Sequence, residues 1–227
     1  MVDFHQNGNI ATLHNLRTRS LQEMTYELET FAQTRKMSLI LPCLYSELKT
    51  DAMPNILSEL AKVTYLHRVI IGLDRATEDQ FRHAKQFFEG LNQNHIVIWN
   101  DSPRMLALGN RLEQMGLAPT EQGKGKNVWT SIGYLIGCQD SAVMAIHDCD
   151  ILTYTNELLA RLIYPVANPT FPYQVAKGYY ARIGSDKLNG RVTRLLVSPL
   201  LIALKRVIGD RDYIDYLRSF RYPLSGE

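Results

Sequence analysis

Two aspartates follow directly after an apolar run in the segment A-I-H-D-C-D-I-L, which spans residues 145–152. In extended chain, residues i and i+2 lie on the same side of the backbone, so Asp148 and Asp150 would point the same way. Two carboxylates held that close repel each other unless a positive charge lies between them. One of the two is therefore a candidate ligand for a hard divalent cation, Mg²⁺ or Mn²⁺, while the other orients nearby hydroxyl groups. The alternative is a turn that only caps a helix.

A short glycine and lysine segment, Gly123-Lys124-Gly125-Lys126, opens the helix expected before this strand. Glycine lets another group approach the backbone closely, and a helix N-terminus favours anions. Lys124 is therefore a candidate contact for a phosphate or a sugar hydroxyl. The spacing is not that of a Walker A loop, and the alternative is a solvated loop with two surface lysines.

A third candidate segment, L-P-C-L-Y-S-E over residues 41–47, ends the first expected strand. Proline lacks an N–H, so we expect Pro42 to stop the strand and to leave backbone groups free to bind a nucleobase, with help from Glu47. The alternative is an ordinary loop between a strand and a helix.

A fourth candidate segment, G-R-V-T-R over residues 190–194, follows a polar loop. The guanidinium of Arg191 suits a phosphate or a carboxylate, and the amides of Gly190 and Thr193 with the Thr193 hydroxyl add further donors. A surface turn before a helix is the alternative reading.

The elements that must position these segments alternate between strand and helix. A helix is expected over residues 18–35, before the sheet. Strands are then expected over residues 37–41, 68–72, 95–99 and 142–146, and helices over 53–62, 78–91, 103–115 and 127–137. This order predicts an α/β fold with a doubly wound, mostly parallel sheet, in which ligands bind beyond the carboxyl ends of the strands. A helix over 156–163, a strand over 173–180 and helices over 199–207 and 212–220 are expected to follow.

Composition indicates which kinds of partner the chain could bind and which cellular compartment suits it. The chain has 227 residues and a net charge of +2, which gives no general attraction to nucleic acid or to a membrane surface. No apolar run reaches the length of a membrane span, and the first residues lack signal-peptide features. Cys43, Cys138 and Cys149 are scattered, as is typical of free thiols in a reducing cytoplasm. Neighbouring carboxylates make Cys149 a poor nucleophile, and His147 is either a ligand or simply a residue at the strand end.

Taken together, the motifs L-P-C-L-Y-S-E, G-K-G-K-N-V-W, H-D-C-D-I and G-R-V-T-R-L-L-V-S-P-L-L resemble those of glucosyl-3-phosphoglycerate synthases. These are retaining glycosyltransferases of the glycosyltransferase A fold, which is Rossmann-like. The resemblance covers residues 37–227 and leaves residues 1–36 as an N-terminal helical extension. Paired aspartates after a strand occur in many nucleotide-sugar enzymes, whereas the ordered set of four motifs is more specific.

The resemblance implies that glucose moves from a nucleoside diphosphate glucose to the 2-hydroxyl of 3-phosphoglycerate, with Mg²⁺ or Mn²⁺ as cofactor. It implies that Asp150 binds the metal and that Lys124 and Asp148 contact the donor, Asp148 at the ribose or sugar. It further suggests a homodimer. The residues assigned to the nucleoside pocket are Pro42, Cys43, Leu44 and Glu47, and those assigned to the acceptor are Gly190, Arg191, Val192 and Thr193.

Three departures from the family pattern leave alternatives open. Asp74 stands where the family has a serine-rich turn, so it is assigned to the base or ribose while the choice of nucleotide stays open. His147 replaces an apolar residue. The family continues beyond the position of Glu227 with helices that supply a histidine ligand and part of the acceptor lid. Another nucleotide sugar such as GDP-mannose, another acidic acceptor, or a non-catalytic nucleotide-sugar-binding protein are the alternatives.

Overall fold

The computed structural model describes residues 19–178, 193–209 and 211–219, which fall into two compact units. The first unit, Arg19–Ala176, contains the sheet, and the described residues from Lys177 onward belong to the second. Residues 19–36 are part of the same unit as the sheet. Within the described residues, no helix is both long and apolar enough to cross a lipid bilayer.

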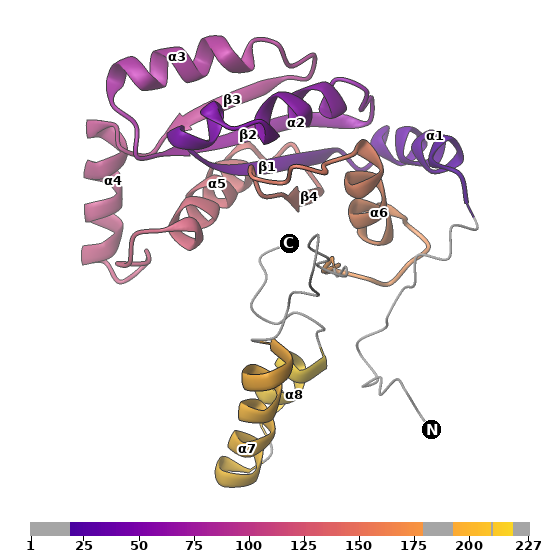
Figure 1. Ribbon diagram of the computed structural model, residues 1–227, viewed down its shortest axis with the longest axis vertical. Helices are drawn as coiled ribbons and strands as arrows, with labels where there is room; N and C mark the ends of the chain where they lie inside the picture. The colour runs from indigo at the N-terminus through magenta and orange to yellow at the C-terminus, as the bar shows by residue number, and fades with distance from the viewer. Residues whose placement is uncertain (1–18, 179–192, 210, 220–227) are drawn as a thin grey trace. The chain divides into compact units, whose positions relative to one another are not determined.

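A four-stranded, all-parallel sheet forms the centre of the first unit (Figure 1). Its strands are β1 (Met37–Leu44), β2 (Leu66–Asp74), β3 (His95–Trp99) and β4 (Val143–Ile146), in the spatial order β3-β2-β1-β4. The chain therefore winds outward from β1 through β2 to β3 and then returns to the other side of β1. The predicted doubly wound parallel sheet is confirmed. Its switch point lies between β1 and β4, where the ends of two adjacent strands leave a crevice for a ligand.

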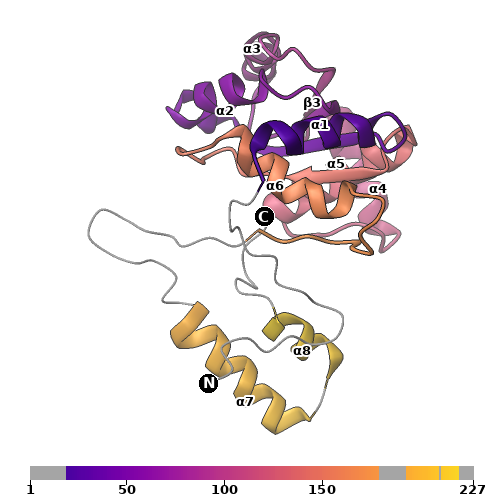
Figure 2. The same ribbon diagram turned by 90° about the vertical axis from the view of Figure 1, so that its right-hand side faces the viewer.

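Helices cover both faces of this sheet. The helices α1 (Leu21–Ala32), α2 (Ala52–Leu60), α3 (Glu78–Phe88) and α6 (Asn156–Ala167) pack on one face, and α4 (Pro103–Gln114) and α5 (Lys124–Cys138) on the other. Successive side chains of a strand point to opposite faces of the sheet, so each face has its own hydrophobic cluster. Leu39 and Leu41 belong to the larger cluster, and Ile40 belongs to the smaller one. Helices α1 and α6, turned toward the viewer in Figure 2, meet through the rings of Phe31 and Tyr164, whose centroids lie 5.9 Å apart.

Proline at position 42 does not stop the first strand, and this prediction was wrong. Strand β1 continues through Pro42 to Leu44, with Pro42 paired to Gly72 of β2. The amide of His147 donates to the Ile40 carbonyl, so Ile40 turns its backbone polar groups toward β4. Pro42, two residues on, faces the same way, but β4 has already ended there. The missing N–H of Pro42 therefore costs no ladder hydrogen bond.

Other element boundaries moved for local reasons. The predicted start of a helix at Ser102-Pro103 is confirmed, and the Ser102 hydroxyl accepts from the Met105 amide at 3.2 Å. Helix α5 begins at Lys124 rather than at residue 127, so Lys124 and Gly125 are helical and not a loop. Helix α6 runs past the expected end at residue 163 and through Pro165 to Ala167. The strand expected over residues 173–180 is absent from 173–178, the part of that range within the described chain.

The second unit is described through a π-helical turn η2 (Thr193–Val197) and the helices α7 (Ser198–Ile208) and α8 (Asp212–Ser219). These agree with the expected helices over residues 199–207 and 212–220. Helices α7 and α8 are joined by an ion pair between Lys205 Nζ and Asp215 Oδ2 at 2.8 Å.

Candidate active site

A cavity of about 870 Å³ opens at the switch point of the sheet. It is bounded by the carboxyl ends of β1 and β2, by α4, by the start of α5 and by the turn after β4. Every described residue that the sequence assigned to the donor or the metal lines this one cavity. These residues are Pro42, Cys43, Leu44, Glu47, Asp74, Lys124, Asp148 and Asp150.

The two aspartates after β4 have different environments. Asp148 is half-buried and forms an ion pair with Lys124 Nζ, whereas Asp150 lies in a turn and is exposed. Among the described residues, Asp150 takes part in no ion pair. An exposed carboxylate on a cavity wall is the kind of ligand that Mg²⁺ and Mn²⁺ prefer. Asp150 therefore fits a hard cation, and Asp148 is already balanced by a lysine.

The position of Lys124 depends on the backbone conformation of Gly123, the residue before it. Gly123 is the N-cap of α5 with a φ of 146°, a backbone conformation that residues with a side chain rarely adopt. The first turn of α5, which includes Lys124, therefore begins at the cavity without a side-chain cap. The free N–H groups of such a turn attract anions, and the ammonium group of Lys124 adds a full positive charge.

Glu47 lies in the 3₁₀ helix η1 (Tyr45–Lys49), directly after β1. Its Oε2 accepts a hydrogen bond from the Leu44 amide at 2.6 Å. Burial raises the pKa of Glu47, the Leu44 amide opposes this shift, and the charges of Asp150 and Asp148 add to it. Glu47 thus carries a carboxyl that is held in place by the backbone and whose ionisation is disfavoured by its surroundings.

Asp74, at the end of β2, is held by two asparagines. Asn100 Nδ2 donates to Asp74 Oδ1 at 2.7 Å, while burial raises the pKa of Asp74 against the hydrogen bonds from Asn100 and Asn127. Asn127 is itself buried in α5 and donates to the Gly72 carbonyl at 2.7 Å. Asn127 was not among the site residues predicted from the sequence. The only signal was a polar residue one position after the lysine segment.

The surroundings of His147 and Cys149 show whether the first could be a ligand and the second a nucleophile. His147 is buried, its Nδ1 lies 3.1 Å from the Tyr154 hydroxyl, and burial lowers its pKa to about 4. It packs behind the strand end and does not line the cavity, which supports the structural reading. The pKa of Cys149 is raised, as predicted, although the main cause is a hydrogen bond with Cys43, followed by burial. Cys149 is therefore a poor nucleophile.

The charge of the cavity wall bears on what can bind there. Five carboxylates line it against three basic side chains: Glu47, Asp74, Asp101, Asp148 and Asp150 against Arg75, Lys124 and Lys126. A polyanion entering this wall alone would meet net repulsion. A divalent cation held by Asp150 would offset that excess of negative charge, because a bound cation is the largest local charge in such a site.

The acceptor residues cannot be placed in the same way. Gly190, Arg191 and Val192 lie outside the described residues, and only the backbone of Thr193, at the start of η2, is described. Their assignment to an acceptor remains a prediction from the sequence.

No protein-family model matches the chain. Two curated relatives, both named glucosyl-3-phosphoglycerate synthase, match it in full: one from Persephonella marina, 49% identical over 227 residues, and one from Methanococcoides burtonii, 37% identical over 229 residues. The matched region is 56% of the first relative and 55% of the second, so the chain spans about half of their length.

Solved structures of glucosyl-3-phosphoglycerate synthase from Mycobacterium tuberculosis share the fold. The complex with Mg²⁺ and UDP gives a TM-score of 0.56 at 23% identity and covers 89% of this chain and 58% of that one. The complex with Mn²⁺, UDP-glucose and phosphoglyceric acid gives 0.52 at 21% identity and covers 89% and 59%. At this identity the likeness supports the fold alone, and it agrees with the predicted glycosyltransferase A architecture. By sequence, the chain is similar along its whole length to two proteins named glucosyl-3-phosphoglycerate synthase, whereas the resemblance predicted from the four motifs covers residues 37–227.

Proposed function

We propose that the chain carries the donor and metal site of a retaining glucosyl-3-phosphoglycerate synthase. In this reaction a nucleoside diphosphate glucose donates glucose to 3-phosphoglycerate in the presence of Mg²⁺ or Mn²⁺. The observation that carries the proposal is that one cavity gathers all eight described residues assigned to donor and metal. The match of the whole of this chain to about half the length of relatives of that name supports the choice of donor and acceptor class.

Each polar group of the cavity has a role in this proposal. Asp150 would hold the cation, which neutralises charge on the departing diphosphate when it is bound. The ends of β1 and β2, with Glu47 and Asp74, would receive the nucleoside. Lys124 and the first turn of α5 would face the diphosphate, where negative charge grows as the glycosidic bond breaks.

The ion pair between Lys124 and Asp148 gives donor binding a specific consequence. A diphosphate that attracts Lys124 competes with Asp148 for the ammonium group. The Asp148 carboxylate is then free to accept a hydrogen bond from a ribose or sugar hydroxyl. Donor binding would thus exchange one internal ion pair for two contacts with the donor.

Three free thiols suit a reducing compartment, so we place the proposed reaction in the cytoplasm. The acceptor would be held by Gly190, Arg191, Val192 and Thr193. This part of the proposal rests on the sequence motif alone.

Product formation tests the proposal directly. The 227-residue chain is incubated with 3-phosphoglycerate and either UDP-glucose or GDP-glucose, with Mg²⁺ or with a chelator, and the products are identified by mass spectrometry. A metal-dependent product with the mass of glucosyl-3-phosphoglycerate is expected. Donor binding without product would instead favour a non-catalytic nucleotide-sugar-binding protein, and product only with another sugar or acceptor would favour a related transferase.

Two variants and one matched control locate the reaction. Asp150→Asn and Lys124→Ala should each lower product formation by on the order of 100-fold, because each removes charge stabilisation at the leaving group. Lys62→Ala is the control, since Lys62 is an exposed lysine paired with Glu59 and does not line the cavity. Unchanged donor affinity and turnover in both cavity variants would refute the assignment.

A further inference from the structure

We propose that Cys43, Glu47 and Cys149 form a second cation site, selective for thiophilic divalent ions such as Zn²⁺, and that its occupancy excludes the nucleotide from the cavity. The binding step stands on the geometry of the three side chains. The exclusion step rests on the proposed donor site, because Cys43 and Glu47 are assigned to the nucleoside.

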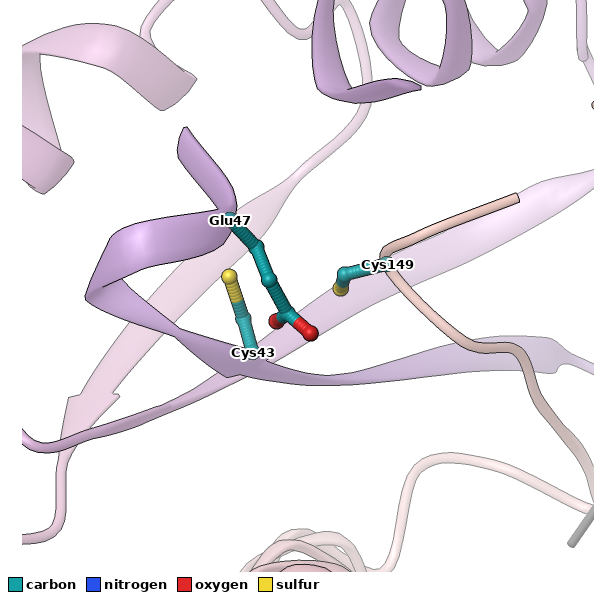
Figure 3. A group of neighbouring side chains, drawn as sticks. All are labelled: Cys43, Glu47 and Cys149. Atoms are coloured by element: carbon teal, nitrogen blue, oxygen red, sulfur yellow. The ribbon is translucent and has the colours of Figure 1, made fainter. Parts of the chain in front are cut away.

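The three side chains converge from separate parts of the chain. Their ligand atoms, two sulfurs and a carboxylate oxygen, all lie within 4.8 Å of one another. In Figure 3 the Glu47 carboxylate lies between the sulfurs of Cys43 and Cys149. Both cysteines are only 1% exposed, yet all three residues border the cavity, so an ion can reach them from that side.

Strand pairing explains why the two thiols meet. Strands β1 and β4 pair in register up to Ile40 opposite Ile146. Counting three residues further along each strand leads from Ile40 to Cys43 and from Ile146 to Cys149. Cys149 lies in the turn after β4, and a hydrogen bond between the thiols of Cys43 and Cys149 brings the two sulfurs side by side.

The ligand types favour a softer ion than the one proposed at Asp150. Zn²⁺ binds thiolates at about 2.3 Å and carboxylate oxygens at about 2.0–2.2 Å, which separates tetrahedral ligand atoms by roughly 3.5–4 Å. The ligand atoms lie within 4.8 Å of one another, so the cluster needs a contraction of at most about 1.3 Å to reach that geometry. Thiolates select Zn²⁺ over Mg²⁺, which prefers oxygen ligands and retains its waters. All three residues border the cavity, so a water molecule from it could complete the coordination.

Binding changes bonds in a defined way. Each thiol releases its proton to solvent as its sulfur coordinates the ion, so two protons leave for each Zn²⁺ bound through both thiolates. Glu47 can coordinate through one oxygen while Oε2 keeps the hydrogen bond from the Leu44 amide. Bound metal would thus hold the end of β1 and η1 against the turn that carries Asp150. The same groups could then no longer contact a nucleoside.

Cobalt is the probe that reports ligation without an activity assay. Co²⁺ is titrated into the full chain in excess Mg²⁺, and thiolate-to-cobalt charge-transfer absorption is recorded, followed by displacement with Zn²⁺. We expect one Co²⁺ per chain with thiolate absorption that Zn²⁺ removes. Cys138→Ser should keep the signal, because Cys138 lies at the end of α5 beside Arg68 and outside the cluster. Cys43→Ser with Cys149→Ser should lose it, and Glu47→Gln should weaken binding while both thiols remain.

A second measurement needs no cluster variant and so does not depend on their folding. In the wild-type chain, Zn²⁺ should slow alkylation of Cys43 and Cys149 but not of Cys138, as read by peptide mass spectrometry. Absence of thiolate absorption in the wild-type chain, or alkylation slowed equally at all three cysteines, would overturn the second site. If Co²⁺ binds through the thiols but UDP binding with Mg²⁺ is unaffected, the exclusion step is wrong. A metal-independent failure to bind UDP would count against the proposed function instead.

Discussion

Gly72 is the position where one added methyl group should do most damage to the site. It lies in β2 between Pro42 of β1 and Ile98 of β3. A Cβ at Gly72 would meet Asn127 Oδ1 at 2.0 Å and Ser131 Oγ at 2.8 Å. Real Cβ contacts are not that short, so Gly72→Ala requires α5 or the Asn127 side chain to move.

The structure sets the size of the effect. Overpacking at a tightly packed contact costs about 1–3 kcal/mol. Displacing Asn127 also breaks its 2.7 Å hydrogen bond to the Gly72 carbonyl and leaves buried polar groups unpaired, at a further cost of about 1–3 kcal/mol. We expect Gly72→Ala to lower the free energy of unfolding by about 2–6 kcal/mol. For a chain of this size that corresponds to a loss of roughly 4–24 °C in Tm.

Urea and thermal unfolding followed by circular dichroism measure this loss. Gly137→Ala is the matched control, because Gly137 lies in α5, the helix that carries Asn127 and Ser131, and a Cβ there meets no atom within 4 Å. That control should be neutral or stabilised by up to about 1 kcal/mol through helix propensity. Gly72→Ala combined with Asn127→Ala should recover part of the loss, because the clashing amide is gone. A loss below about 0.5 kcal/mol in Gly72→Ala would refute the packing argument.

Three further predictions concern stability. Burial lowers the pKa of His147 to about 4, whereas the pKa of this histidine in the unfolded chain is about 6.5. The unfolded chain therefore binds the proton more readily than the folded one. As a result, the free energy of unfolding should fall by about 3 kcal/mol as the pH drops from 6.5 toward 4. In urea titrations at stepped pH, His147→Gln should flatten this fall, and an unchanged slope would contradict it. Tyr154→Phe should cost about 1–3 kcal/mol at neutral pH, measured by thermal unfolding, because it leaves buried His147 Nδ1 without its partner at 3.1 Å. Ser102→Ala should cost about 0.5–2 kcal/mol and Ser102→Gly only a few tenths, so equal losses in chemical unfolding would exclude a capping role.

Local signals in the sequence predicted much of the fold. The strand at residues 95–99 and the helix start at Ser102-Pro103 match the structure, because an apolar run and a capping serine act over a few residues. The alternation of strands and helices was enough to predict a parallel sheet. Strand β2 is longer than expected, reaching from Leu66 to Asp74, because it pairs on both sides with β1 and β3.

The errors arose where tertiary context outweighs local preference. Pro42 stays in a strand because β4 ends before it, which the sequence of β1 alone does not reveal. Helix α6 continues through Pro165 because Ala160, Tyr164 and Ala167 bury one face against the core. The range 173–178 has a strand-like composition, but Val175 is 69% exposed and no ladder forms there.

The same contrast between local signals and tertiary context applies to the residues of the candidate site. Residues recognisable by type and motif, such as Glu47, Lys124 and the two aspartates, were assigned from the sequence, and the structure brings them to one cavity. Asn127 and the pairing of Cys43 with Cys149 were missed. Both depend on the packing of α5 on the sheet and on the register between β1 and β4, which are long-range properties of the fold.

The two aspartates that follow β4 would repel each other in a continued strand, and the structure places them in different environments. In a continued strand Asp148 and Asp150 would share one face and one environment, and each would need a counter-charge. The chain instead turns at Cys149, so Asp148 is half-buried beside Lys124 while Asp150 is exposed at the cavity wall. An ion pair thus offsets one carboxylate from within the protein. The other takes part in no ion pair among the described residues and lies among a surplus of carboxylates on the cavity wall, so its negative charge is available to a cation from solvent.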